Sequence, residues 1–411
     1  MVAIPPIVYN SSLKKKLMND PVYAQRLTAF RVKDIYKDEF FSNSPPSIFV
    51  GSRYYPEANV GVLSPPERKN DVSLYDDQKY WVENNLDIGT ILHYRSQLIN
   101  SRFRTDVTAV RSPDHKFLTL AREIGMSKTP VDTEVKLKKK IRLNVHFDDT
   151  SLPMGPRGNL TQLKIGNTKI PQHIDKVYAD TDMKTIDAIN YLQKHDYNEH
   201  TLSQLMSIGV FGQKNKRVLV PTRWSITATH SLLANEKLSR IKQYPLLDEY
   251  CFFSGNYLGN YYFIMLFPDM YAYELFETYM PGSFWNPTMS VNISTDFEPF
   301  KGRTAYVEQT AGGFYATRLG LTEYLDMVKR QASLFVFRVE SPEYWAGLGV
   351  WVVLEAVRKT LKNKPIHFHD KTQLITFFKQ KIFEAFKFDV HETLMNSKLM
   401  EHLKQKRLSE F

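Results

Sequence analysis

The feature of this sequence that most constrains its fold is the irregular order of its strand-like and helix-like segments. Short β-rich runs occupy residues 47–51, 250–254, 261–267 and 333–340, with helical apolar spacing between them. Neither a regular strand–helix–strand rhythm nor an internal repeat of roughly 20 to 50 residues is present. This order predicts an α+β protein with mixed sheets, interspersed helices, a helical C-terminal region and a flexible basic tail.

Local patterns predict individual elements. Residues 134–147 alternate apolar and basic side chains, which predicts one half-buried strand with a positively charged outer face. A strand over 216–220 should lead into a helix from residue 221, and the runs at 250–254 and 261–267 should form a hairpin. Further helices are expected over residues 183–195, 202–208, 348–361, 371–386 and 390–404.

Composition narrows the class of protein. A net charge of +10 over 411 residues favours anionic partners such as nucleic acid or an acidic protein, although such an excess also serves solubility. Cys251 is the single cysteine, which excludes an internal disulfide framework and a zinc site of paired thiolates. The most apolar windows, 261–267 and 348–357, are too short to cross a bilayer, and the start has no signal-peptide pattern. We therefore expect a cytoplasmic protein without a membrane partner.

The loop after the run at 47–51 is the first candidate site. It carries Arg53, Tyr54, Tyr55 and Asn59 among Gly and Pro residues. Loops at strand ends often hold ligands, and tyrosines beside an arginine can stack on bases and pair with phosphate. The alternative is a packed surface loop with a buried tyrosine pair.

The start of the helix near residue 221 is the second candidate, for a phosphate or nucleotide. Arg223 adds positive charge, Trp224 and His230 lie nearby, and Ser225 could cap the helix and leave amides free for an anion. Ser225 and His230 point in different directions on one helix, so no hydrolase triad is predicted.

Weaker patterns occur in the last third of the chain. Arg318 lies on a helix that follows two glycines, but no phosphate-binding lysine follows them, which argues against ATP hydrolysis by that route. The acidic pairs Glu340 with Glu343 and Glu308 with Glu323 are better explained as salt-bridge partners than as magnesium ligands. Two histidines alternate before an aspartate, which would suit either a metal or simple solvation, so no metal ligand is assigned: His367, His369 and Asp370.

The last seven residues, QKRLSEF, place Gln405, Leu408 and Phe411 at intervals of three. In a 3₁₀ turn, residues three apart eclipse one another, so Leu408 and Phe411 would form one apolar plug with Gln405 apart from it. This spacing resembles the peptide that binds the sliding clamp PCNA, with one terminal aromatic instead of two. The alternative is a frayed helix end.

Four segments, at 45–66, 218–233, 312–325 and 345–358, resemble the archaeal Nre family of DNA-repair proteins. The resemblance implies a basic arm (1–22), an N-terminal region (23–288), a C-terminal region (289–400) and a clamp-binding tail (401–411). It also implies a role in the response to DNA damage together with the clamp. Some members carry an N-terminal cysteine-bearing zinc motif, which this chain cannot form.

These observations favour a repair protein that is recruited by PCNA and whose body binds DNA or a nucleotide. Two alternatives remain at this stage. One is an enzyme, such as a nuclease or transferase, that uses the region of Arg53 and Arg223, and the other is an adaptor that does not touch DNA. The residues identify neither a cofactor nor an oligomeric state.

Overall fold

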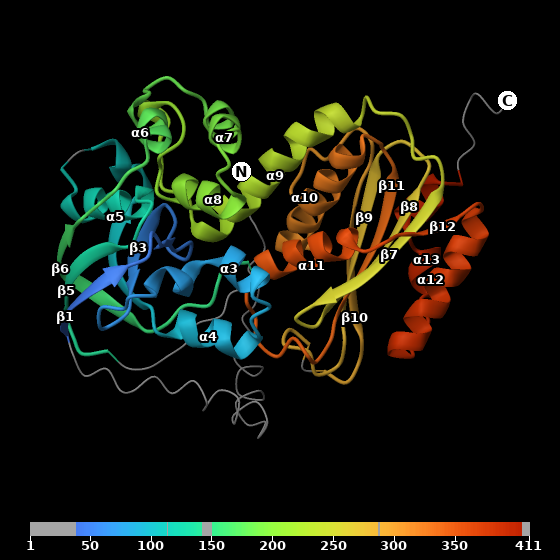
Figure 1. The fold of residues 1–411 in the computed structure, drawn as a ribbon, viewed down its shortest axis with the longest axis horizontal. Coiled ribbons are helices and arrows are strands. Elements are labelled where there is room, and N and C mark those ends of the chain that lie inside the picture. Colours follow the sequence, from blue (N-terminus) through green and yellow to red (C-terminus); the bar gives the residue numbers. More distant parts are fainter. Residues whose placement is uncertain (1–37, 113, 142–149, 287, 405–411) are drawn as a thin grey trace.

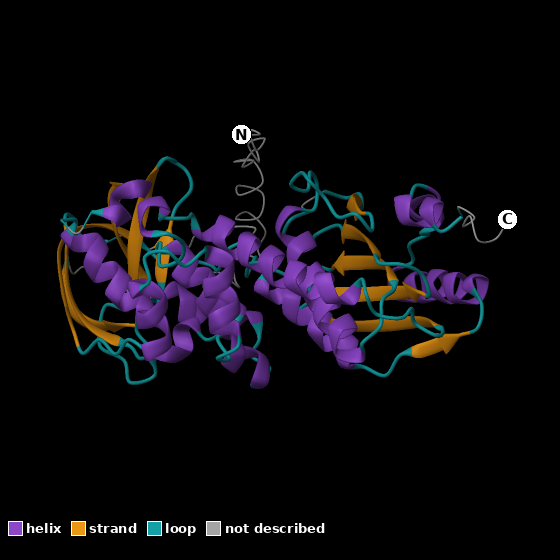
Figure 2. Ribbon diagram, turned by 90° about the horizontal axis from the view of Figure 1, so that it is seen from above, coloured by secondary structure: helices purple, strands orange, loops and turns teal. Residues whose placement is uncertain are grey.

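In the computed structural model, the protein contains two six-stranded sheets, and helices pack against each of them (Figure 1). The structure describes residues 38–112, 114–141, 150–286 and 288–404. The sheets lie in two units placed side by side along the long axis, with helices between them (Figure 2). The α+β class predicted from the order of segments is confirmed.

The first sheet has the order β1-β5-β6-β4-β3-β2, antiparallel except for the parallel pair β4–β6. Its strands are β1 (Glu39–Ser44), β2 (Ile48–Val50), β3 (Glu57–Ser64), β4 (Ile99–Asp106), β5 (Val131–Leu137) and β6 (Arg157–Gly166). Every second residue of β5 is buried, as the alternating pattern predicts. The strand ends at Leu137 because three exposed lysines, 138–140, interrupt that alternation; residues 142–147 of the prediction lie outside the described residues.

Helices connect and cover the strands of this sheet, and the long helix α9 follows them. They are η1 (Val72–Asp76), α3 (Gln78–Glu83), α4 (Ile88–Ser96), η2 (Val107–Arg111), α5 (Lys116–Met126), α6 (Gln172–Ala179), α7 (Thr185–Gln193), α8 (Glu199–Ser207), η3 (Lys214–Lys216) and α9 (Thr222–Ile241). Helices α7 and α8 confirm two predictions, and Gly209 follows α8 with a φ of 71°.

The predicted strand at 216–220 is wrong, although the segment is extended and enters α9 as expected. Its backbone amides at Leu219 and Val220 donate to the carbonyls of Val107 in η2 and Ser207 at the end of α8. The Arg217 guanidinium also donates to the carbonyls of Tyr178 and Asp180 at the end of α6, and none of the described strands pairs with the segment. Residues 217–220 therefore form an extended connection into α9 and not a strand.

The second sheet has the order β10-β9-β11-β8-β7-β12. Its strands are β7 (Tyr250–Tyr257), β8 (Asn260–Phe267), β9 (Ala272–Tyr279), β10 (Asn292–Glu298), β11 (Ser333–Glu340) and β12 (Ile366–Phe368). Strands β7 and β8 form the predicted hairpin, and its two turn residues, Leu258 and Gly259, both have positive φ. Strand β11 is buried along its length between β8 and β9.

Helices cover both faces of the second sheet (Figure 1). On one face lie α10 (Ala311–Val328) and α11 (Trp351–Lys362), and on the other lie α12 (Lys371–Phe386), α13 (His391–Met395) and α14 (Lys398–His402). The single helix predicted over 390–404 is thus two helices. The break occurs because Ser397 caps α14, while the Glu274 carboxylate on β9 accepts from the amides of Lys398 and Leu399.

Candidate functional site

The two regions that the sequence singled out, 53–59 and 223–230, meet at the surface. The rings of Tyr55 and Trp224 lie edge to face, with 5.1 Å between their centroids. Tyr54 and Tyr55 are 43% and 51% exposed. The guanidinium of Arg104 lies over the Tyr54 ring at 4.0 Å, and that of Arg53 lies at 5.6 Å. We call these five residues the aromatic patch: Arg53, Tyr54, Tyr55, Arg104 and Trp224.

Hydrogen bonds of two hydroxyl groups tie the patch to neighbouring helices and strands. The amide of Val50, at the end of β2, donates to the Thr222 hydroxyl at the start of α9 over 2.9 Å. The Ser207 hydroxyl at the end of α8 donates to the Val220 carbonyl and lies 3.3 Å from the Thr222 hydroxyl. The loop that carries the tyrosines is therefore joined to the helix that carries Trp224.

Arg104 was not among the residues predicted from the sequence. It lies on β4 opposite Asn59 of β3, and it is exposed while its neighbours Phe103 and Thr105 are buried. The alternation in β4 could have shown that Arg104 points outward, but only the sheet register places it beside Tyr54. Asn59 is half-buried, and its carbonyl accepts from the Gly51 amide.

The other predicted residues have different positions. Arg223 is half-buried in the first turn of α9. Ser225 does not cap α9: Pro221 occupies the cap position, and the buried Ser225 hydroxyl donates to the Thr222 carbonyl. Arg318 lies apart from the patch, because it is buried in α10 and bonds to the side chains of Glu298 and Asn235, both at 2.7 Å.

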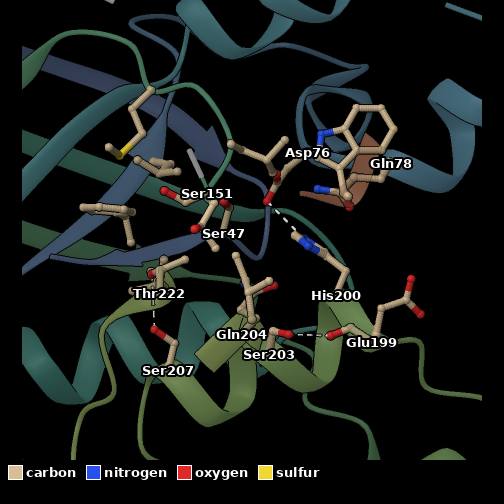
Figure 3. Close-up of a pocket in the computed structure, with 18 of the residues that line it drawn as sticks. Ser47, Asp76, Gln78, Ser151, Glu199, His200, Ser203, Gln204, Ser207 and Thr222 are labelled. Carbon is tan, nitrogen blue, oxygen red and sulfur yellow. Dashed lines mark hydrogen bonds and ion pairs between the residues drawn. The ribbon is translucent and has the colours of Figure 1, made fainter. Parts of the chain in front are cut away.

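A cavity of about 90 Å³ lies behind the patch, where the two units meet (Figure 3). Segments from β2, η1, α3, α8, α9 and α11 form its wall. On α8 the contributing residues recur at helical spacing, and so do those of α9. The polar residues of the wall include Ser47, Asp76, Gln78, Arg95, Glu199, His200, Ser203, Gln204, Ser207, Thr222 and His230.

A buried ion pair lies on one side of this cavity. The Asp76 carboxylate contacts the Arg95 guanidinium at 2.5 Å, and His200 Nε2 lies 3.6 Å from its other oxygen. Burial opposes ionisation of Asp76, but Arg95 and the bond from His200 outweigh it, so the pKa of this carboxyl is lowered. Arg95 also donates to the carbonyls of Tyr75 and Pro153. Asp76 is therefore ionised at neutral pH.

Three nitrogen atoms of the cavity wall are buried and have no hydrogen-bond partner among the described residues: Gln78 Nε2, Gln204 Nε2 and His230 Nδ1. His230 is only 3% exposed. Burial lowers the pKa of its imidazole to about 4, so the ring is neutral at pH 7. Sequence reasoning singled out His230 but missed both glutamines. Helical spacing with Ser203 and Ser207 could have pointed to Gln204 on α8, whereas no sequence pattern marked Gln78 on α3.

Three of the four residues in the acidic pairs of the last third have other side-chain partners. Glu340 is buried beside Arg338, whereas Glu343 accepts from the Tyr261 hydroxyl. Glu323 pairs with Arg358 at 2.8 Å, and Glu308 is exposed.

His367 and His369 lie on the same side of the chain, as their alternation predicts. Their Nδ1 atoms lie 3.1 and 3.7 Å from the carboxylate of Glu249. Across the described ranges, no group of three or more His, Cys, Asp or Glu side chains could hold a metal ion.

These features define a two-sheet α+β protein that carries an arginine-flanked aromatic surface beside a partly polar cavity. The chain belongs to the archaeal Nre family. The models of the Nre N-terminal and C-terminal regions match residues 19–286 and 298–411, which confirms the resemblance of the four segments. Strands β7 to β9 precede the border between the two matches and β11 follows it, so one sheet contains strands from both.

Three relatives illustrate this membership. The DNA repair protein NreA of Haloferax volcanii is 32% identical over 80% of this chain and 79% of its own length. The DNA repair protein NreA of Archaeoglobus fulgidus is 36% identical over 82% and 84%, and NreB of the same organism, also named a DNA repair protein, is 32% identical over 91% and 92%. No solved structure matches the chain. Within the described residues, every helix is too short or too polar to span a membrane.

Proposed function

We propose that this protein acts in DNA repair, that its body binds unpaired DNA through the aromatic patch, and that the sliding clamp recruits it through the C-terminal tail. The observation that carries the proposal is the convergence of Tyr54, Tyr55 and Trp224 with two arginines on one surface. The names of the relatives, which are all DNA repair proteins, support it.

The composition of the patch suits single-stranded or locally unpaired DNA. Exposed aromatic rings bind bases by stacking, which needs bases that are not already stacked in a duplex. Arg53 and Arg104 lie beside those rings and can neutralise the phosphates that flank a stacked base. The net charge of +10 adds a long-range attraction to the same ligand.

The tail residues Gln405, Leu408 and Phe411 lie outside the described residues, so their role rests on the spacing of the motif. The described chain leads up to them through α14, which Glu274 holds against β9. The motif is therefore joined to the body through a short, well-anchored helix. Binding through a terminal peptide leaves the aromatic patch free for DNA.

Calorimetric titration of the organism's sliding clamp tests the tail. The intact chain should bind, and the chain that lacks residues 405–411 should not. A variant with Ser409→Ala and Glu410→Ala is the matched control, because it changes the tail but keeps the three motif residues, and it should bind like the intact chain. Equal binding by the shortened chain would refute the role of the motif.

Fluorescence anisotropy of a labelled single-stranded oligonucleotide tests the patch. We expect binding that weakens steeply with salt and leaves the oligonucleotide intact. Turnover that is lost in Arg223→Ala, with folding unchanged, would indicate an enzyme instead. Clamp binding without DNA binding at low salt would indicate an adaptor.

A further inference from the structure

We propose that the cavity behind the aromatic patch binds a single nucleobase, held in plane by Gln78, Gln204 and His230. The base could come from a DNA strand, as an extruded nucleotide, or from a free nucleoside. Only the first source rests on the proposed function; binding of the ring itself does not.

The apolar part of the wall suits a flat ring. Phe49, Leu152, Ile226 and Trp351 contribute to it. The indole nitrogen of Trp351 already donates to the Leu348 carbonyl at 2.8 Å, so the ring offers the cavity its apolar surface. A volume of about 90 Å³ is too small for a whole nucleotide, so at most a single ring could enter from the solvent side, with the lining side chains moving to admit it.

The polar part of the wall would be satisfied by a ligand with hydrogen-bonding groups on its edge. A buried donor or acceptor without a partner typically costs about 1–3 kcal/mol. The unpartnered atoms of Gln78, Gln204 and His230 come from three different helices, α3, α8 and α9, and line one cavity. The edges of a nucleobase carry several donors and acceptors in one plane, so one such ring can satisfy groups that approach from different sides.

The charges around the cavity disfavour anionic ligands. Asp76 is ionised, and Arg358 lowers the pKa of Glu199 to about 2 although burial opposes this. The two arginines nearest these carboxylates, Arg95 and Arg358, are already paired with them. A phosphate or carboxylate ligand would meet this negative charge, and Arg95, the arginine among the described lining residues, is already paired with Asp76. An acyl chain would leave the three polar atoms unsatisfied. A neutral heteroaromatic ring meets neither obstacle.

The cavity also lies next to the surface on which we place DNA. Thr222 lines the cavity and bonds to Val50, while Trp224, two residues further along α9, belongs to the aromatic patch. Phe49 and His200, which are half-exposed, form part of the wall, so the cavity lies close to solvent. Enzymes and repair proteins that inspect a base take it out of the stack into such a pocket, and an unpaired base is the easiest to move.

Two titrations of the full-length protein test the inference and separate the two sources. The first uses free adenosine, guanosine, cytidine and thymidine in a calorimeter. The second compares two labelled duplexes by anisotropy, one with a single mismatched pair and one with an abasic site at the same position. We expect either a nucleoside or the mismatched duplex to bind better to the intact protein than to Gln204→Leu, by about tenfold. Binding of the abasic duplex should not change.

Gln78→Leu, on the opposite side of the cavity, provides a second variant if Gln204→Leu does not fold, as judged by circular dichroism. Nucleoside binding that depends on either glutamine, without DNA binding, would support the inference with a free ligand and refute the proposed DNA function. Equal affinity for both duplexes, combined with no nucleoside binding, would overturn the inference and leave the DNA function standing.

Discussion

Tyr55, in the loop after β2, and Trp224, in the first turn of α9, meet edge to face at 5.1 Å. The pair links two segments that the sequence places far apart, and it lies beside Tyr54 and Arg104. Edge-to-face pairs stabilise their own geometry, so the surface is preformed before any ligand arrives.

Trp224→Ala should weaken the binding of single-stranded DNA. Stacking of one base on an aromatic ring contributes about 1–3 kcal/mol, which corresponds to a loss of roughly fivefold to a hundredfold in affinity. Anisotropy titrations at fixed salt measure the change. Phe383→Ala is the control, because Phe383 is a 56% exposed aromatic residue on α12, in the other unit. Equal losses in both variants would argue against a specific role of the patch.

Arg104→Gln should reduce the salt dependence of DNA binding. One lost phosphate contact lowers the slope of log affinity against log salt by about 0.7 for a single strand. Arg68→Gln is a matched control, since Arg68 is an exposed arginine of the same unit that pairs with Asp132. An unchanged slope for Arg104→Gln would show that this arginine does not touch phosphate.

His230 should make the protein less stable in acid. The pKa of this histidine is about 4 in the folded protein and 6.5 when it is free in solution. Between these values the unfolded chain binds the proton and the native chain does not, so stability falls as the pH drops from 6.5 to 4. The loss attributable to His230 is about 3 kcal/mol. Urea unfolding across this pH range should show a shallower decline for His230→Gln, and identical declines would contradict the prediction.

Gly313→Ala should destabilise the second unit. A Cβ at Gly313 would lie 2.0 Å from Glu277 Oε1, and that oxygen is held at 2.5 Å by buried Arg338. The carboxylate cannot move without breaking the pair, so we expect the free energy of unfolding to fall by about 1–3 kcal/mol. Gly166→Ala is the control, because its Cβ would meet open space. Thermal or urea unfolding of both variants measures the difference.

Local patterns in the sequence determined the elements whose stabilising contacts lie nearby along the chain. Strand β11 and helix α12 have the predicted bounds, Ser333–Glu340 and Lys371–Phe386. The β7–β8 hairpin also formed as expected, because its turn joins directly adjacent strands. Periodicity and turn residues are local properties, so the sequence alone reveals them.

Tertiary structure decided which of these elements meet. The register of β3 and β4 brought Arg104 to Tyr54, and the packing of α3, α8 and α9 enclosed Gln78, Gln204 and His230 around one cavity. The run at 216–220 formed no strand because two of its amides, at Leu219 and Val220, donate to carbonyls in η2 and at the end of α8. These contacts depend on residues that are distant in the sequence. A local pattern does not encode which distant groups will satisfy a buried polar atom or cover an apolar face.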